Sequence, residues 1–198
     1  MYLTMLLLAA ADFASNPLWY ATRASGLAAF VLLTLSVALG VLTTQRVATG
    51  WWPRFASQAL HRNVSLLAVA LLVTHVVTTV LDSYVDISWW SALIPFASTY
   101  EPLWVGLGTL AFDLLIIVAL SSLVRSATGH RWWRLLHWTT YAAWPLALTH
   151  YLATGTDALQ PWSLAIAAVS TVVVLAAVLV RLFSQPGERP TTMIGTHR

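Results

Sequence analysis

Residues 60–75 read LHRNVSLLAVALLVTH, an apolar stretch with a histidine near each end. His61 and His75 stand fourteen positions apart, and leucine, valine and alanine fill most of the interval. Ionisable groups in so apolar a segment are costly to bury and are default candidates for function. The stretch therefore indicates a membrane span and a candidate site together.

Composition assigns the whole chain to the membrane. Of its 198 residues, 59% are hydrophobic and only 9% are charged, far below the usual quarter for a soluble domain. Cysteine is absent, which excludes disulfides, Cys-ligated zinc, iron–sulfur clusters and thioether-attached haem. The net charge of +3 reflects arginines in loops, and we expect no nucleic-acid partner.

Apolar runs of about 20 residues recur along the sequence and predict an all-α, polytopic helical bundle in a lipid bilayer. Residues 1–17 form a short apolar segment that is compatible with a truncated sixth span, an interfacial helix or an uncleaved signal-like segment. Residues 18–183 form one transmembrane domain, and the polar tail at 184–198 is expected to be disordered. The five predicted transmembrane helices cover 18–43, 57–81, 102–124, 133–154 and 162–181.

Loop charges predict the orientation. Nine of the ten arginines fall on one side of the predicted spans, and acidic residues predominate on the other. The positive-inside rule makes the arginine-rich side and the C-terminus cytoplasmic, so we expect a multi-pass protein of a bacterial cytoplasmic membrane. The nine are Arg46, Arg54, Arg62, Arg125, Arg131, Arg134, Arg181, Arg189 and Arg198.

A second helix repeats the histidine pattern. His137 and His150 lie thirteen positions apart in RLLHWTTYAAWPLALTH, residues 134–150. Intervals of this size span roughly 20 Å along a helix, and both helices run from inside to outside. His61 and His137 should therefore share one depth, and His75 and His150 another. Two imidazoles at each of two levels is the layout of two bis-histidine haems, whereas a lone histidine is often only a helix contact or a proton relay.

Cations near each level would serve the haem propionates. Arg62, Arg131 and Arg134 are candidates at the inner level, and Arg23 at the outer level. Arg23 is the one arginine against the charge trend, which predicts a local partner for it.

The interval of thirteen leaves about 140° between the two histidines of an ideal helix, whereas fourteen leaves about 40°. Pro145 lies between His137 and His150, and a kink there would re-aim the outer end.

These residues resemble the ferric reductase-like transmembrane domain, the haem-carrying membrane part of ferric reductases and NADPH oxidases. The same family includes the membrane haem subunit of the bacterial periplasmic methionine sulfoxide reductase system. The resemblance covers roughly residues 18–183 and rests on the two histidine pairs, one interval being a residue longer than the other. It is supported by TRASG at 22–26, LHR at 60–62, WRLLH at 133–137 and GTD at 155–157.

The resemblance implies two b-type haems, with His61 and His137 as ligands of the inner haem and His75 and His150 of the outer. It also implies that electrons pass from the cytoplasmic side to an acceptor or redox partner at the outer face. Unlike the full reductases, this sequence shows no FAD- or NAD(P)H-binding domain, so a quinol or a separate flavoprotein would be the donor. The glycines of VGLG at 105–108 are expected in a helix, as a close-packing site.

Asp113 lies in the middle of the third predicted span. It is compatible with proton transfer, with support of a quinol or a ligand imidazole, and equally with a protonated, internally bonded acid. Two rival functions stay open from the sequence: a quinol-linked b-type cytochrome of another fold, and a haem-free transporter or assembly protein whose histidines handle protons or metal ions.

Overall fold

The computed structural model of the protein describes residues 16–45 and 53–183, and these ranges are helical with short connections. The expected N-terminal segment, except for its last two residues, and the expected disordered tail lie outside the described residues. The helices are α2 (Pro17–Thr44), α3 (Arg54–Leu81), α4 (Trp89–Leu93), α5 (Pro102–Leu123), α6 (Arg125–Thr128), α7 (His130–Trp138), α8 (Thr140–Thr154) and α9 (Pro161–Phe183).

Four of these helices, α2, α3, α5 and α9, are long and apolar enough to cross a membrane. Large apolar side chains cover the outside of the bundle; Leu66 and Val172, for example, are 54% and 66% exposed. An apolar surface of this kind suits lipid. The helices also satisfy their own backbone hydrogen bonds, as a lipid environment requires. The prediction of an all-helical, multi-pass membrane protein is confirmed at this level.

The predicted continuous helix over 133–154 is wrong. The chain forms α7 and α8 instead, with a turn at Thr139 between them. The hydroxyls of Thr139 and Thr140 donate to the carbonyls of Leu136 and His137, each at 2.7 Å. These side-chain bonds compete with the helical backbone pattern directly after His137. Pro145, the predicted kink, lies inside α8 and away from the break.

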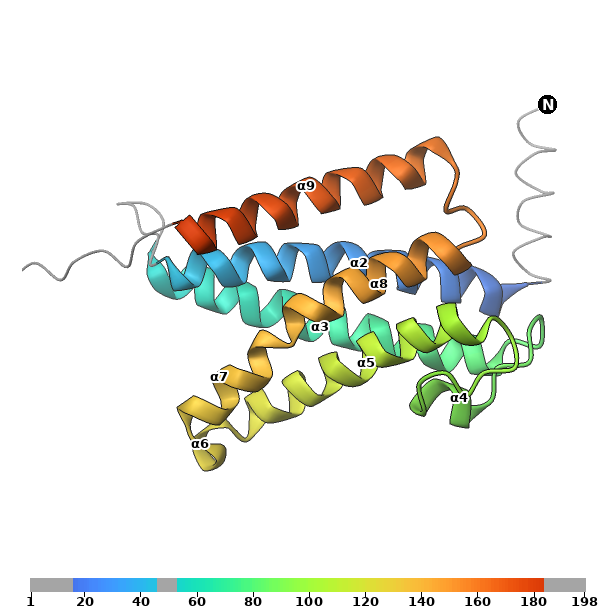
Figure 1. The fold of residues 1–198 in the computed structure, drawn as a ribbon, viewed down its shortest axis with the longest axis horizontal. Helices are drawn as coiled ribbons and strands as arrows, with labels where there is room; N and C mark the ends of the chain where they lie inside the picture. The colour runs from blue at the N-terminus through green and yellow to red at the C-terminus, as the bar shows by residue number, and fades with distance from the viewer. Residues whose placement is uncertain (1–15, 46–52, 184–198) are drawn as a thin grey trace, which may run out of the picture.

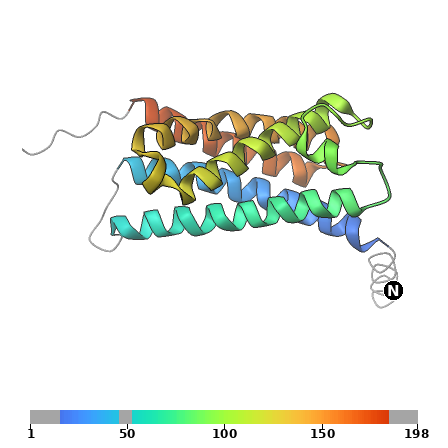
Figure 2. The same ribbon diagram turned by 90° about the horizontal axis from the view of Figure 1, so that it is seen from below.

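Helix α2 lies at the centre of the arrangement. It packs along α3 and, on another side, along α9, while α5 packs along α8 (Figures 1 and 2). Two hydroxyl pairs join α2 to α3: Thr22 to Thr78 at 2.9 Å, near one end of the pair of helices, and Ser36 to Ser65 at 2.6 Å, further along. Short polar side chains of this kind let helices approach closely within a membrane.

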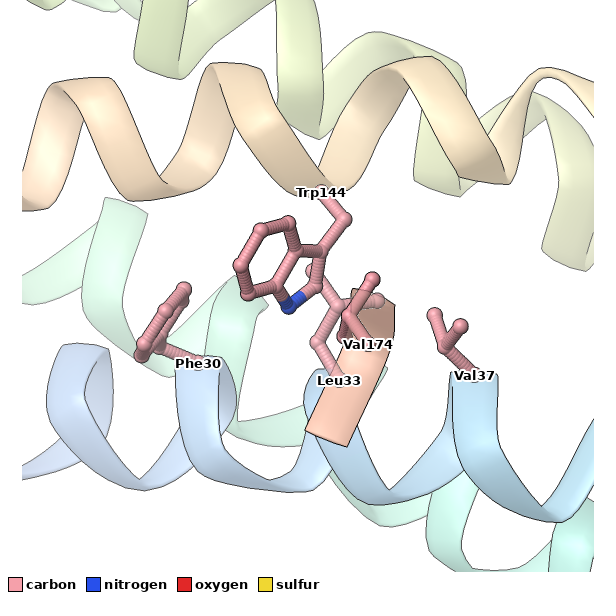
Figure 3. Packing of buried hydrophobic residues seen from close by; sticks show 5 residues of the cluster. All are labelled: Phe30, Leu33, Val37, Trp144 and Val174. Atoms are coloured by element: carbon pink, nitrogen blue, oxygen red, sulfur yellow. The ribbon is translucent and has the colours of Figure 1, made fainter. Parts of the chain in front are cut away.

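The buried core lies between the predicted inner and outer levels. Its fully packed members are Phe30, Leu33 and Val37 from α2, Trp144 from α8 and Val174 from α9 (Figure 3). The indole N–H of Trp144 donates to the hydroxyl of Thr34 at 3.0 Å, which satisfies the polar edge of the largest residue in the core. This contact joins α8, which carries His150, to α2.

Candidate functional site

A cavity of about 1460 Å³ lies inside the bundle between α2, α3, α5, α7 and α8. It is larger than the roughly 300–1,000 Å³ usual for a single small-molecule pocket. The four predicted ligand histidines, His61, His75, His137 and His150, line it, and so does His130, the first residue of α7. The surface of the cavity is mainly apolar, and side chains from α2, α3 and α5 contribute to it.

The four histidines form two facing pairs across this cavity. The ring centroids of His61 and His137 are 6.2 Å apart with planes at 75°, and those of His75 and His150 are 6.4 Å apart with planes at 78°. This is the pairing that the sequence predicted from depth alone. His137 on α7 and His150 on α8 both line the cavity, although their interval would place them about 140° apart on one straight ideal helix.

Three of the imidazoles are held by main-chain carbonyls of the neighbouring helix. A carbonyl only accepts hydrogen bonds, so each Nδ1 carries the proton and each Nε2 keeps its lone pair for a ligand in the cavity. The bonds run from His61 Nδ1 to Ser36 O (3.0 Å), from His75 Nδ1 to Thr22 O (2.8 Å) and from His150 Nδ1 to Trp104 O (2.9 Å).

A glycine follows each accepting carbonyl by four residues and leaves room for the ring. A Cβ added at Gly26 would lie 2.7 Å from His75 Nδ1, and one at Gly108 would lie 2.5 Å from His150 Nδ1. At Gly40 the contact, with His61 Cε1, would be 3.3 Å. Because these glycines have no side chain, each leaves a space on its helix in which one imidazole lies. We call these three spaces, at Gly26, Gly40 and Gly108, the cradles.

Sequence analysis missed the cradles, although a signal was present. Fourteen residues separate Gly26 from Gly40, the same interval that separates His61 from His75. Equal intervals on two antiparallel helices bring each glycine opposite one histidine. Of the predicted close-packing glycines of α5, Gly106 meets the side chain and backbone of Phe96, and Gly108 meets His150, so that prediction is confirmed.

His137 differs from the other three. Its Nδ1 is buried and has no hydrogen-bond partner within the described part of the chain. Its ring stacks instead on Trp133, with centroids 4.9 Å apart and planes at 28°.

The predicted arginines fall at two ends of the cavity. Arg62 and Arg134 line it together with the inner histidines, whereas Arg131 is not among the described lining residues. Arg23 lines it with the outer histidines, forms an ion pair with Asp157 and lies over the ring of Trp19 at 3.9 Å. The expected local partner of Arg23 is therefore Asp157, the last residue of the GTD motif.

Asp113 does not reach the site. It is half-buried in the middle of α5, it is not among the residues that line the cavity, and its carboxyl group has no hydrogen-bond or ion-pair partner within ranges 16–45 and 53–183. Within the described residues Asp113 therefore contacts no ligand imidazole, and its part in proton transfer or in binding a quinol stays a prediction.

Within the described residues, no three His, Cys, Asp or Glu side chains come together as a set for a bare metal ion. The histidines meet in twos. A pair of trans imidazoles suits a metal whose other four ligands come from a macrocycle.

Comparison with known proteins identifies a family whose description gives no activity. Residues 17–157 match the family described as Domain of unknown function (DUF8596). No curated protein and no solved structure matches the chain. The family description names no cofactor or reaction, so the resemblance to ferric reductase-like domains stays a prediction.

Proposed function

We propose that this chain, a member of the DUF8596 family of domains of unknown function, carries electrons across a membrane through two bis-histidine b-type haems. The observation that supports this proposal is the pair of ring separations, 6.2 and 6.4 Å. A metal–imidazole bond of about 2 Å on each side, plus roughly 1 Å from each nitrogen to its ring centre, separates two trans imidazoles by about 6 Å.

The residues of the site fit a haem at each level. Three of the four imidazoles are fixed as neutral ligands by Nδ1 bonds to carbonyls, the second contact that metal-ligating histidines usually make. The cavity supplies apolar walls for a porphyrin, and its volume exceeds that of one ordinary ligand pocket. Arg62 and Arg134 supply positive charge for propionates at the inner level.

Bound haem would supply a one-electron couple at each level. The chain itself would present one imidazole nitrogen from each side of the cavity at each level. It would also exclude water with leucine, valine and phenylalanine side chains and keep the two levels apart. The fourteen residues from His61 to His75 span roughly 20 Å of α3, so each haem would lie near one membrane surface. Two such stations would carry electrons over most of the bilayer thickness.

The proposed direction of transfer combines orientation with the resemblance to ferric reductase-like domains. Arginines concentrate at the end of the bundle that carries His61 and His137, which by the positive-inside rule supports a cytoplasmic location for this end. Electrons would enter there from a flavoprotein or a quinol and leave to an acceptor at the outer face. This is the ferric reductase-like arrangement without a nucleotide-binding domain, and it would make the chain the membrane subunit of an oxidoreductase.

The test is a reduced-minus-oxidised visible spectrum of the purified full-length protein, with the haem content measured as the pyridine haemochrome. We expect b-type bands and two haems per chain. H75A should retain one haem, because it removes a single axial ligand of the outer pair, whereas H197A, altered outside the described residues, should retain two. Lack of b-type bands after expression with ample haem would refute the proposal, and unchanged haem content in H75A would refute the ligand assignment.

A further inference from the structure

Among the four predicted ligand histidines, His137 alone has neither a carbonyl nor a glycine to hold it within the described residues. Its Nδ1 has no partner among the described residues. On α5, Gly108 lies opposite His150, but thirteen residues further, at the interval that separates His137 from His150, stands Ser121. The hydroxyl of Ser121 donates to Val118 O at 2.9 Å and so serves its own helix. The device that fixes the other three rings is therefore missing here.

Trp133 supplies the contact that His137 has instead. It lies four residues earlier on α7, hence on the same helix face, and its ring stacks on the imidazole at 4.9 Å. The planes are only 28° apart, so the indole covers one face of the imidazole. A ring covered in this way cannot rotate about its Cβ–Cγ bond without losing that contact.

Trp133 is itself held from several sides. Its indole N–H donates to the hydroxyl of Ser122 on α5 at 3.1 Å. The guanidinium of Arg125 lies over its ring at 5.1 Å, and the ring of His130 lies 5.4 Å away. The indole is thus a fixed surface between α5 and α7 and not a freely moving side chain.

We propose that Trp133 is the positioning residue for His137, and that its stacked indole sets the orientation of this imidazole as the second axial ligand of the inner haem. The proposal rests on the proposed function. It makes the two levels unequal: both outer imidazoles are fixed by backbone carbonyls, whereas one inner imidazole depends on a side chain. The inner haem is therefore the one whose ligand orientation depends on a neighbouring aromatic side chain.

The experiment measures the rate at which each haem leaves the full-length protein for an excess of apomyoglobin, together with the low-spin electron paramagnetic resonance spectrum. In W133L we expect one of the two haems to leave at least about tenfold faster, the scale on which contacts behind a metal ligand act. The resonance of that same haem should shift, because the angle of 75° between the planes of His61 and His137 is no longer fixed. W133F keeps a stacking ring and should recover most of the wild-type behaviour.

W132L is the matched control, because Trp132 precedes Trp133 on the same helix and is 67% exposed. It should leave both rates and both resonances unchanged. S122A removes the acceptor of the indole N–H together with the bond of the same hydroxyl to Val118 O within α5, and it should accelerate the loss of the same haem by a smaller factor. This variant provides the test if W133L fails to fold. If wild-type protein binds two haems and neither W133L nor S122A changes the release or the spectrum of one of them, this inference is overturned while the proposed function stands. If wild-type protein binds none, the proposed function fails first.

Discussion

Alanine substitution of Gly26 or Gly108, the two cradle glycines beside the outer histidines, should release the outer haem without weakening the fold. Ordinary carbon contacts are about 3.5 Å or longer. Against this distance, the added Cβ requires the imidazole to move by about 0.8 Å in G26A, by about 1 Å in G108A and by only about 0.2 Å in G40A. The three substitutions therefore form a graded series with the same chemical change.

Movement on this scale breaks the bond behind the ligand. The Nδ1 bonds of His75 and His150, now 2.8 and 2.9 Å, would stretch beyond the distance at which such contacts count as hydrogen bonds. Loss of such a contact typically lowers metal affinity by about 10–100-fold. We expect this loss for the outer haem in G26A and G108A, and at most a few-fold effect on the inner haem in G40A.

Haem content by pyridine haemochrome and the rate of transfer to apomyoglobin measure the effect. Thermal unfolding of the haem-free protein is the control, because alanine stabilises a helix interior by about 0.5–1 kcal/mol relative to glycine. Haem loss together with equal or higher stability would separate ligand positioning from misfolding. Wild-type retention of both haems in G26A and in G108A would refute the reasoning.

Two further substitutions test the packing around the site. T34V leaves the buried indole N–H of Trp144 without its acceptor and should lower the free energy of unfolding by about 1–3 kcal/mol, seen as a lower Tm in detergent, whereas T34S should retain most of it. Equal Tm values for T34V and wild type would contradict this. For the ion pair of Arg23 and Asp157, whose side chains are each 30% exposed, a double-mutant cycle of R23A and D157A should give a coupling of no more than about 1 kcal/mol. Strictly additive single effects would mean that the pair contributes nothing.

Hydropathy located the long helices because an apolar run in lipid must pair its own backbone hydrogen bonds, and a helix does this within one segment. The predicted span 18–43 is α2, Pro17–Thr44, and 102–124 is α5, Pro102–Leu123. The break between α7 and α8 could not be found in this way. Two threonine hydroxyls bond to carbonyls at the break, but the hydroxyl of Thr34 makes the same kind of bond within unbroken α2, so threonine alone does not mark a break.

The histidine pairing could be predicted because helical rise converts sequence intervals into depth. What holds the rings could not, because a main-chain carbonyl is present at every residue and no side chain marks the one that accepts. The need of Arg23 for a partner followed from its charge, but Asp157 as that partner emerged only from the folded chain. Whether Asp113 faces the cavity likewise could not be predicted, because it depends on how α5 is rotated about its axis in the folded bundle.

The use of backbone oxygens as acceptors bears on how such a site can evolve. A carbonyl persists through any substitution, so positions 22, 36 and 104 can exchange side chains without changing the acceptor that each imidazole meets. Relatives could drift in sequence until only the spacing survives: two glycines fourteen residues apart on one helix, then two histidines fourteen apart on the next. That spacing would identify distant members of the family where overall sequence similarity has faded.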